Sequence, residues 1–441
     1  MSIDTAEYAQ RRDRLMAAIG NSSAIFRSAP LATAHNDVEH PFRQESDFFY
    51  LTGFNEPDAV AVLAPHHEEH RFILFVQPKD PERETWTGYR VGVEQAQALY
   101  GADAVYSIHE LDTKLPEYLK KAERLYYRFS LDRAFDNTVL RHWQKLLRLY
   151  PKNGYAPRAL EDVRFVLHPL RQLKSEAELT AIRRATAIAT AAHNRAREVA
   201  RPGLYEYQIQ AEIEYVFRMS GASGPAYPSI VASGPNACIL HYVENNRQLQ
   251  AGDLLLIDAG CAFGYYNSDI TRTFPVGGQF NREQQIIYEL VLEAQQQAIA
   301  AVKPGEPYNA FHDAAVATIV DGLLDLKLLT GDRDEIIKEE KYKHFFMHRT
   351  GHWLGLDVHD AGGYKQNEED WLPLQPGHVV TVEPGIYIAP DIRAPEGQPE
   401  VPAEWRGIGV RIEDDVLVTA QGCEVLTEGV PKAIAALAAA A

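Results

Sequence analysis

The chain has 441 residues, of which 46% are hydrophobic and 24% are charged. This composition is ordinary for a globular protein, and the length favours two domains over one hydrophobic core. The formal net charge is −17, from 44 basic and 61 acidic residues. An acidic chain without a block of Lys and Arg argues against nucleic acid as a partner and against binding to an anionic membrane.

No apolar run reaches transmembrane length, and the first residues lack the apolar core of a secretory signal. The three cysteines are too few and too scattered for a disulfide framework. We therefore expect a cytoplasmic protein with reduced thiols and no membrane partner.

The amino-terminal part of the chain mixes helical and strand patterns. Residues 6–19 are typical of a helix that ends at Gly20, and residues 114–128 of a helix that continues into a strand. The apolar runs 59–65 and 70–77 predict two strands. These patterns predict an α/β domain built on a mixed sheet.

A domain boundary is expected just before a strong helix signal. Ser175 and Glu178 have the spacing of a capping box, in which each side chain accepts a hydrogen bond from the other residue's backbone N–H. Apolar residues then recur at helical spacing until Pro202 interrupts the pattern. We therefore divide the chain into two domains, residues 1–172 and 173–441.

The second domain contains both helices and strands, so we expect an α/β (α+β) fold overall. Helices are predicted at about 205–219, 282–302 and 309–328 and in an alanine-rich tail, 434–441. Strands are predicted at 228–234, 254–263, 269–277, 378–388 and 408–419.

Four carboxylates and one histidine lie in or beside apolar, strand-like segments of the second domain. Asp and Glu are rarely buried unless they are paired or bind a metal. Four hard oxygen ligands and one imidazole suit a pair of divalent ions that activates water. The sequence therefore predicts a two-metal hydrolase, with the candidate ligands Asp258, Asp269, His352, Glu383 and Glu413.

Asp258 and Asp269 flank a connection that contains Gly264. The segments on either side can pair as antiparallel strands, which places neighbouring side chains on one face about 5 Å apart. Two carboxylates at that separation repel each other unless a cation lies between them. A solvated hairpin face is the alternative; it suits Asp269 tolerably and Asp258 badly, because four apolar residues precede Asp258.

Arg411 lies two residues before Glu413, so both side chains should point to the same face of a strand. An arginine beside a carboxylate ligand keeps that ligand ionised and can also bind a substrate carbonyl. A surface ion pair is the alternative, which the flanking apolar residues disfavour. We expect Asp414 and Asp415 to be solvated or loop-capping residues.

Three histidines, His348, His352 and His359, fall in one short segment that contains glycine. A single histidine is more often a satisfied structural residue than a ligand, and His241 taken alone is a weak candidate of this kind. Three histidines so close together favour a functional site.

Four segments of the second domain resemble the pita-bread metallopeptidase family, and in particular its aminopeptidase P members. They are LIDAGCAFGYYNSDITRTFPV (256–276), HRTGHWLGLDVHD (348–360), TVEPGIYIAP (381–390) and RGIGVRIEDD (406–415). The amino-terminal part also resembles that group, notably at residues 35–60 and 83–90. The resemblance therefore covers nearly the whole chain and implies a catalytic pita-bread domain, in which helices cover a curved antiparallel sheet.

The resemblance also implies two divalent metal ions bridged by hydroxide, usually manganese, with zinc or cobalt as alternatives. Asp258 and Asp269 match the ligands of the first ion, and Glu413 also reaches it. The positions that match the second ion's ligands are Asp269, His352, Glu383 and Glu413, with Asp269 and Glu413 shared.

The matching auxiliary residues are His241, His348, His359, Asp37, Tyr387 and Arg411. By this resemblance Glu383 carries the proton from the nucleophile to the leaving nitrogen, and His359 helps to stabilise the developing oxyanion. Trp86 is a candidate wall of the proline pocket, supplied in relatives by a neighbouring subunit; a position in the core or an interface of the amino-terminal domain is the alternative.

The activity implied is metal-dependent hydrolysis of the first peptide bond in peptides whose second residue is proline, by a homodimer or homotetramer. Prolidase, which cleaves only Xaa-Pro dipeptides with the same ligands, is the alternative within the family. Methionine aminopeptidase normally lacks this amino-terminal domain, and a metal-free creatinase-like enzyme is disfavoured because all five ligands are present. A non-catalytic binding protein of the same fold is the alternative from another class.

Overall fold

The computed structural model describes residues 3–394 and 396–438. The chain divides into two compact units, Ser2–Leu170 and Arg171–Ala441, and each has its own hydrophobic core. The predicted tail helix is present as α13 (Ile434–Ala438), and the last three residues of that prediction lie outside the described ranges. No described helix is long and apolar enough to cross a membrane.

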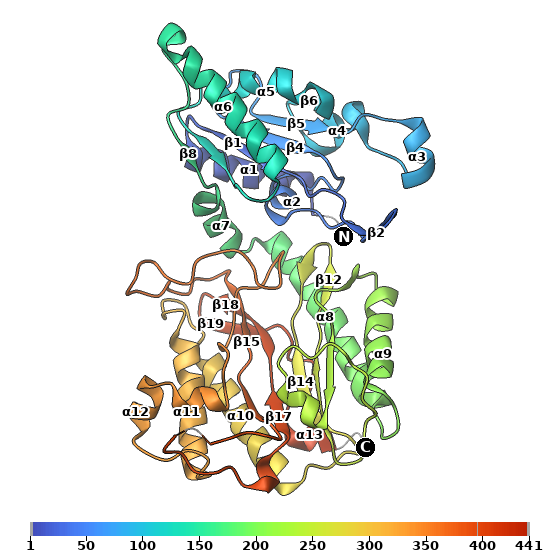
Figure 1. Ribbon diagram of the computed structural model, residues 1–441, viewed down its shortest axis with the longest axis vertical. Helices are drawn as coiled ribbons and strands as arrows, with labels where there is room; N and C mark the ends of the chain where they lie inside the picture. The colour runs from blue at the N-terminus through green and yellow to red at the C-terminus, as the bar shows by residue number, and fades with distance from the viewer. Residues whose placement is uncertain (1–2, 395, 439–441) are drawn as a thin grey trace. The chain divides into compact units, whose positions relative to one another are not determined.

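The amino-terminal unit is built on a six-stranded mixed sheet with the order β6-β5-β4-β1-β7-β8 (Figure 1). Its central strands pair antiparallel, β1 with β4 and β4 with β5, and the outer strands pair parallel. The strands are β1 (Ser23–Arg27), β4 (Val60–Leu63), β5 (Phe72–Val76), β6 (Ala104–Ser107), β7 (Leu125–Tyr127) and β8 (Leu160–Glu161), and β2 (Thr33–His35) and β3 (Val38–Glu39) form a separate hairpin. The mixed sheet that the sequence predicts is therefore confirmed.

Helices cover both faces of this sheet. Side chains from α5 (Leu111–Leu119) and α6 (Arg133–Asn153) pack with Val62 and Phe75 in one core. On the other face, the Arg12 guanidinium of α1 (Thr5–Ile19) lies 4.0 Å from the centre of the Phe72 ring. The helix α1 ends at Gly20, as the sequence predicts. The remaining helices of this region are α2 (Ser46–Thr52), α3 (Pro81–Thr87), α4 (Gly92–Tyr100) and α7 (Arg164–Gln172).

The second unit begins with the predicted capping box at the start of α8 (Glu176–Val199). The backbone N–H of Glu178 donates to Ser175 Oγ at 3.3 Å, and the N–H of Ser175 donates to Glu178 Oε2 at 3.0 Å. The buried side of α8 packs in the same core as α9 (Glu206–Met219), α10 (Arg282–Ala301) and α11 (Ala310–Asp325). A short helix, α12 (Arg333–Lys338), follows α11.

The strands of this unit pair antiparallel throughout the described ranges, in the orders β10-β11-β14, β15-β18-β19, β13-β12-β9 and β16-β17. The helices lie around these strands (Figure 1). This is the predicted pita-bread fold. The strands are β9 (Gly224–Pro225), β10 (Ile230–Ser233), β11 (Leu254–Asp258), β12 (Cys261–Phe263), β13 (Tyr266–Asn267), β14 (Thr271–Pro275), β15 (Val379–Val382), β16 (Gly385–Ile388), β17 (Ile408–Arg411), β18 (Asp414–Thr419) and β19 (Gly422–Val425).

The register of β11 and β14 positions the candidate carboxylates. The strands pair antiparallel as predicted, but Asp258 lies opposite Thr271, two residues beyond Asp269. The connection at Gly264 forms its own small hairpin, β12–β13. A backbone bridge between Thr271 and Glu413 then joins β14 to the corner between β17 and β18. The candidate ligands therefore meet where β14 lies beside the junction of β17 and β18.

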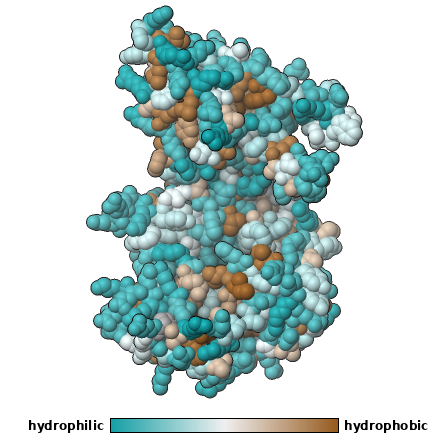
Figure 2. Space-filling model, in the orientation of Figure 1, coloured by the Kyte–Doolittle hydropathy of each residue, from teal (hydrophilic) through white to brown (hydrophobic). Residues whose placement is uncertain are grey.

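The surface is mostly hydrophilic on the face drawn in Figure 2, where hydrophobic residues lie in separate small patches. This distribution agrees with the acidic composition and the net charge of −17.

Candidate active site

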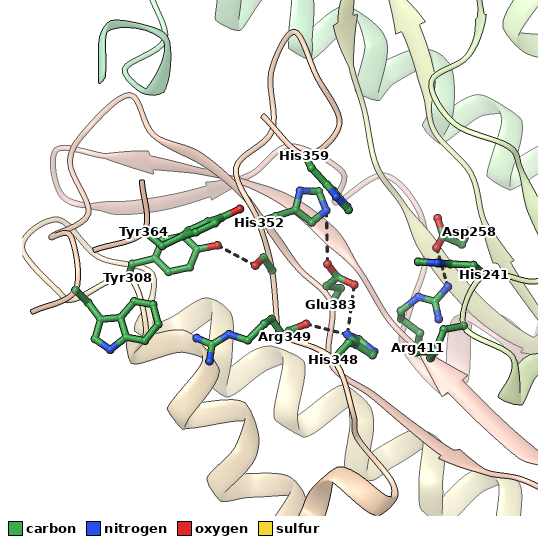
Figure 3. A pocket seen from close by; sticks show the side chains of 13 residues that line it. His241, Asp258, Tyr308, His348, Arg349, His352, His359, Tyr364, Glu383 and Arg411 are labelled. Carbon is green, nitrogen blue, oxygen red and sulfur yellow. Dashed lines mark hydrogen bonds and ion pairs between the residues drawn. The ribbon is translucent and has the colours of Figure 1, made fainter. Parts of the chain in front are cut away.

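A cavity of about 550 Å³ opens in the second unit beside the candidate ligands. Asp258 at the end of β11, His352 and Glu383 line it (Figure 3). Asp269 and Glu413 lie behind them, 5% and 2% exposed. Ligand atoms of Asp269, His352 and Glu413 lie within 4.8 Å of one another. The structure therefore brings together all five residues that the sequence singles out.

His352 shows why this cluster fits a cation. Its Nδ1 lies 3.0 Å from the backbone carbonyl of Trp353, and a carbonyl can only accept, so Nδ1 carries the hydrogen. In the neutral ring the lone pair of Nε2 then faces two carboxylates, Asp269 at 3.5 Å and Glu383 at 3.6 Å. A lone pair and two carboxylates repel one another unless a proton or a metal ion lies among them.

The pKa shifts of the clustered residues show the same repulsion between their charges. Burial opposes a charged ring at His352, but hydrogen bonding to Asp269 and the charge of Glu383 raise the pKa of His352 to about 9. Burial and the nearby Asp269 raise the pKa of Glu383 to about 7, although the charge of His352 opposes the shift. Burial, Asp269 and Glu383 also raise the pKa of Glu413 well above its usual value. The donor set of four carboxylates and one imidazole thus suits divalent ions, which would replace the retained protons.

A tyrosine that the sequence analysis missed joins the two aspartates. The Tyr227 hydroxyl lies 2.6 Å from Asp258 Oδ1 and 2.5 Å from Asp269 Oδ1. Tyr227 precedes β10, whose first residue, Ile230, pairs with Asp258. Tyr227 could therefore have been found from the sequence only through the pairing of β10 with β11, which places the segment before β10 beside Asp258.

Arg411 is buried, and its partner differs from the predicted one. Its Nη2 donates to Asp258 Oδ2 at 2.7 Å, and the charge of Arg411 opposes the rise that burial causes in the pKa of Asp258. Arg411 is separated from Glu413 by Thr271, whose hydroxyl accepts from Arg411 Nε at 3.2 Å and donates to Glu413 Oε2 at 2.7 Å. The expectation that Arg411 holds Glu413 directly was wrong, because β17 ends at Arg411 and the Thr271 hydroxyl of β14 lies between the two side chains.

A chain of hydrogen bonds leads from Arg411 to His348. Burial and the charge of Arg411 lower the pKa of His348 to about 3, so its ring is neutral. His348 Nδ1 donates to the carbonyl of Arg349 at 2.8 Å, which leaves Nε2 to accept from the Tyr387 hydroxyl, also at 2.8 Å. The Tyr387 oxygen accepts in turn from Arg411 Nη1 at 2.9 Å. Each polar atom in the chain thus has a defined donor or acceptor role.

His359 and His241 also line the cavity. The ring centres of His359 and His352 are 4.1 Å apart, and burial and the charge of His352 lower the pKa of His359. His241 lies on an exposed loop after β10. Imidazole N–H groups at these positions can donate hydrogen bonds to a substrate carbonyl.

Two aspartates beside Glu413 contradict the expectation that they are solvated. Asp414 and Asp415 are fully buried. Arg272 Nη2 donates to Asp414 Oδ1 at 2.6 Å, and Lys432 contacts the other oxygen, so both charges hold the pKa of Asp414 well below its usual value against burial. Asp415 Oδ2 accepts from the backbone N–H of Asp269 at 3.1 Å, which fixes the backbone of a candidate ligand. The basic partners lie far away in sequence, so the sequence analysis could not anticipate the burial.

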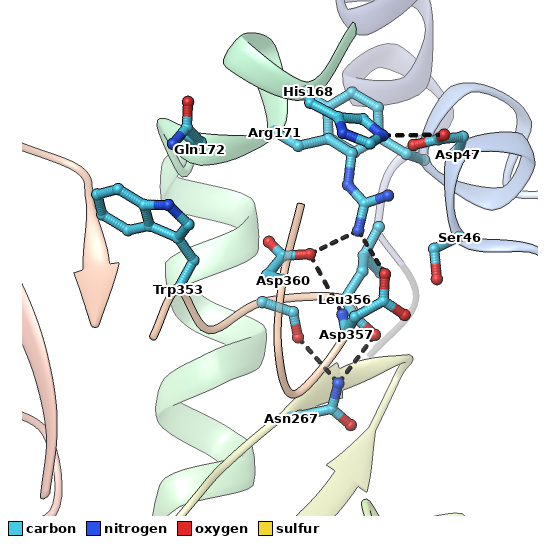
Figure 4. Close-up of polar contacts among 12 residues, drawn as sticks. Ser46, Asp47, His168, Arg171, Gln172, Asn267, Trp353, Leu356, Asp357 and Asp360 are labelled. Atoms are coloured by element: carbon cyan, nitrogen blue, oxygen red, sulfur yellow. Dashed lines mark hydrogen bonds and ion pairs between the residues drawn. The ribbon is translucent and has the colours of Figure 1, made fainter. Parts of the chain in front are cut away.

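A buried ionic cluster fixes the loop that carries His359 (Figure 4). Asp360 Oδ1 accepts from Arg171 Nη2 at 2.5 Å, and Oδ2 accepts from Lys174 Nζ at 2.9 Å. All three side chains are at most 3% exposed. Asn267 Nδ2 donates to the carbonyls of residues 355 and 356 in the same loop, at 3.1 and 2.8 Å.

Two candidates belong to the amino-terminal unit. Asp37 is exposed in the turn between β2 and β3, and its role stays a prediction. Trp86 lies on α3 and is 86% exposed, which excludes a position in the domain core; its place in the proline pocket, or in an interface, stays a prediction.

Fold and site together define a metallohydrolase whose candidate ligands come from the strands and loops of a pita-bread sheet. The family model for the aminopeptidase P N-terminal domain matches residues 8–126, and the one for metallopeptidase family M24 matches residues 180–420. An Escherichia coli Xaa-Pro aminopeptidase is 42% identical over 444 residues, which cover 100% of this chain and 99% of that protein.

Solved structures agree with this assignment. Pseudomonas aeruginosa aminopeptidase PepP is 49% identical, with a TM-score of 0.94 over 100% of this chain and 98% of that one. Zinc-substituted E. coli aminopeptidase P in complex with product is 41% identical, with a TM-score of 0.93 over 100% and 98%. The chain belongs to metallopeptidase family M24, in its aminopeptidase P group.

Proposed function

We propose that this protein removes the first residue from peptides whose second residue is proline, in a reaction that depends on two divalent metal ions. The observation that carries the proposal is the geometry of His352, whose Nε2 faces Asp269 and Glu383 at 3.5 and 3.6 Å beside an open cavity. The Haemophilus influenzae and E. coli relatives, which match over 97% and 100% of this chain at 42% identity, are Xaa-Pro aminopeptidases, and this decides against the prolidase alternative.

The metal ligands we propose are Asp258, Asp269, His352, Glu383 and Glu413. Divalent ions bound there supply activation of water at neutral pH and polarisation of the scissile carbonyl. We favour manganese because the donor set is rich in oxygen, and the zinc-substituted relative keeps zinc as an alternative.

The remaining residues would bind and orient the peptide. Glu383 is the proposed proton carrier, because its carboxylate lies 3.6 Å from His352 Nε2 and 3.7 Å from His348 Nδ1 at the cavity wall. His359 and His241 can donate hydrogen bonds to the substrate carbonyls. We propose that the free amino group of the substrate lies near Asp258. Arg411 holds the Asp258 carboxylate in place through a hydrogen bond of 2.7 Å.

Proline explains why such an enzyme is needed. The bond before proline has no N–H and a fixed φ, so peptidases that clamp an N–H cannot use it. A cavity that holds the ring between aromatic and imidazole side chains needs no such donor. His348 is suited to this role because hydrogen bonds to Arg349 and Tyr387 keep its ring in place.

Several points stay predictions. We propose domain limits at residues 1–172 and 173–441; the two family models match 8–126 and 180–420, on either side of that division. A cytoplasmic location, a homo-oligomer and contributions of Asp37 and Trp86 to the site are also proposed.

The test is release of the first residue from Arg-Pro-Pro by manganese-loaded protein, with EDTA and the dipeptide Ala-Pro as controls. We expect cleavage of the tripeptide that EDTA abolishes. Failure of metal-loaded protein to cleave any peptide with proline second would contradict the proposal and favour a binding protein.

A further inference from the structure

One end of the cavity is aromatic and carries a cation that the proposed reaction does not use. Tyr308, Tyr364 and Trp371 line this end together with Arg349. Figure 3 shows the Arg349 side chain extending away from Glu383 and His348, toward the side of Tyr308 and Tyr364. His241, Asp258 and Arg411 lie on the other side of the reacting centre in the same view.

The Arg349 guanidinium is held in place without an ion pair among the described residues, although its charge opposes the rise that burial causes in the pKa of the nearby Asp313 carboxyl. Its central carbon lies 5.1 Å from the centre of the Trp371 ring, and its Nη2 donates to Asn309 Oδ1. Within the described part of the chain, no carboxylate forms an ion pair with Arg349, which is exposed at the cavity. Stacking on an aromatic ring and one hydrogen bond fix the planar fork and leave further N–H groups for a ligand.

A second cation contacts the same aromatic ring without lining the cavity. Lys365 Nζ lies 4.9 Å from the centre of the same Trp371 ring. Among the described residues, the acidic side chains of the following turn form no ion pair with Arg349; Asp370, for example, accepts a hydrogen bond from Asn367 at 2.8 Å. At this end of the cavity, the positive charge on the lining thus comes from Arg349.

We propose that Arg349 is a specificity-determining residue that binds a carboxylate of the peptide substrate. A planar guanidinium can take a carboxylate through two parallel hydrogen bonds, which neutral groups cannot offer. The inference rests on the proposed peptidase function, since the peptide must lie across the reacting centre to reach Arg349. The carboxylate can come from an acidic side chain in the substrate or from the C-terminus of a short peptide.

Matched peptides separate these sources. Glu-Pro-Ala-amide against Gln-Pro-Ala-amide tests the first side chain, and Ala-Pro-Glu-amide against Ala-Pro-Gln-amide tests the third. Ala-Pro-Ala against its amide tests the C-terminal carboxylate. For the native, metal-loaded enzyme we expect kcat/KM to be about tenfold higher for the charged member of at least one pair, mainly through KM.

Three variants connect that preference to Arg349. Arg349→Gln should bring the ratio within the preferred pair close to one, and Arg349→Lys should keep part of it because the charge remains. Lys343→Gln is the matched control, since Lys343 is an exposed cation nearby that pairs with Glu340 and does not line the cavity. It should keep the native ratio.

The outcomes distinguish this inference from the function on which it rests. One contrary result is that the native enzyme cleaves the neutral peptides but shows no preference in any pair, and another is that Arg349→Gln keeps the preference. Either result would show that Arg349 does not bind a substrate carboxylate, and the proposed peptidase function would stand. If no peptide is cleaved, both proposals fall. A preference that weakens with added salt in the native enzyme and disappears in Arg349→Gln supports the inference.

Discussion

Replacing Asp360 by asparagine tests how the loop that carries His359 is held. The Asp360 side chain is 2% exposed and accepts hydrogen bonds from Arg171 at 2.5 Å and Lys174 at 2.9 Å. Burial opposes the charge of Asp360, but Lys174 and Arg171 hold its pKa at about 2, below the ordinary 3.8. That difference corresponds to roughly 2 kcal/mol of stabilisation when the carboxylate is ionised.

The sign of the pH dependence follows from the lowered pKa. A carboxyl group whose pKa is depressed in the folded protein stabilises it fully above the unfolded pKa, near 3.8. That stabilisation is lost as the pH falls toward about 2. Asparagine removes the charge at every pH and leaves two buried cations without this partner, which typically costs about 3–5 kcal/mol.

Denaturant unfolding of native and Asp360→Asn protein, followed by hydrogen exchange in residues 352–363, measures this effect. We expect the variant to be less stable by about 2–5 kcal/mol near neutral pH, with a gap that narrows below about pH 4. Asp391→Asn, on an exposed turn, is the control and should match the native protein. Equal stability of Asp360→Asn and native protein near neutral pH, or a gap that does not change with pH, would refute the reasoning.

Three further predictions concern the metal site. Tyr227→Phe should weaken manganese binding about 10–100-fold in calorimetry, because the hydroxyl that orients Asp258 and Asp269 is lost. The control Tyr266→Phe loses a buried hydrogen bond to Glu178 and should keep the native manganese affinity. Equal weakening of manganese binding in both variants would point to a general packing effect. Manganese affinity should rise with pH between about 7 and 9, because Glu383 and His352 lose their protons over this range. Calorimetry in buffers of different ionisation enthalpy should detect the protons released on binding. A manganese affinity that does not change with pH would contradict the raised pKa values of these two residues. Tyr387→Phe should lower kcat about tenfold or more at unchanged metal content, because His348 loses its donor, and an unchanged kcat would remove Tyr387 from the site.

Local patterns in the sequence were enough to predict much of the fold. The capping box at Ser175 and Glu178 starts α8, and Gly20 ends α1, because both signals act over a few residues of backbone. Apolar runs gave the positions of β4, β5, β11 and β15 for the same reason. The register that places Asp258 opposite Thr271 depends on the β12–β13 hairpin between β11 and β14, which the sequence pattern did not predict.

The candidate ligands could be found because carboxylates inside apolar strands are costly without a cation. Their supporting residues could not be found in this way. Tyr227, Asp360 and Asp415 act through partners distant in sequence, such as Asp269 for Tyr227 and for Asp415, and Lys174 for Asp360. Only the folded chain shows that Asp414 meets Arg272 in the core, where the sequence suggested a solvated residue.

The central claim is that the cluster around His352 binds metal and that the metal enables cleavage before proline. The most direct measurement titrates metal-free protein with manganese and records bound metal and cleavage of Arg-Pro-Pro on the same samples. The account predicts no cleavage at the start, activity that rises with bound metal and levels off at two ions per chain, and loss of both in His352→Ala. Cleavage that persists without metal, or two bound ions without cleavage, would contradict it.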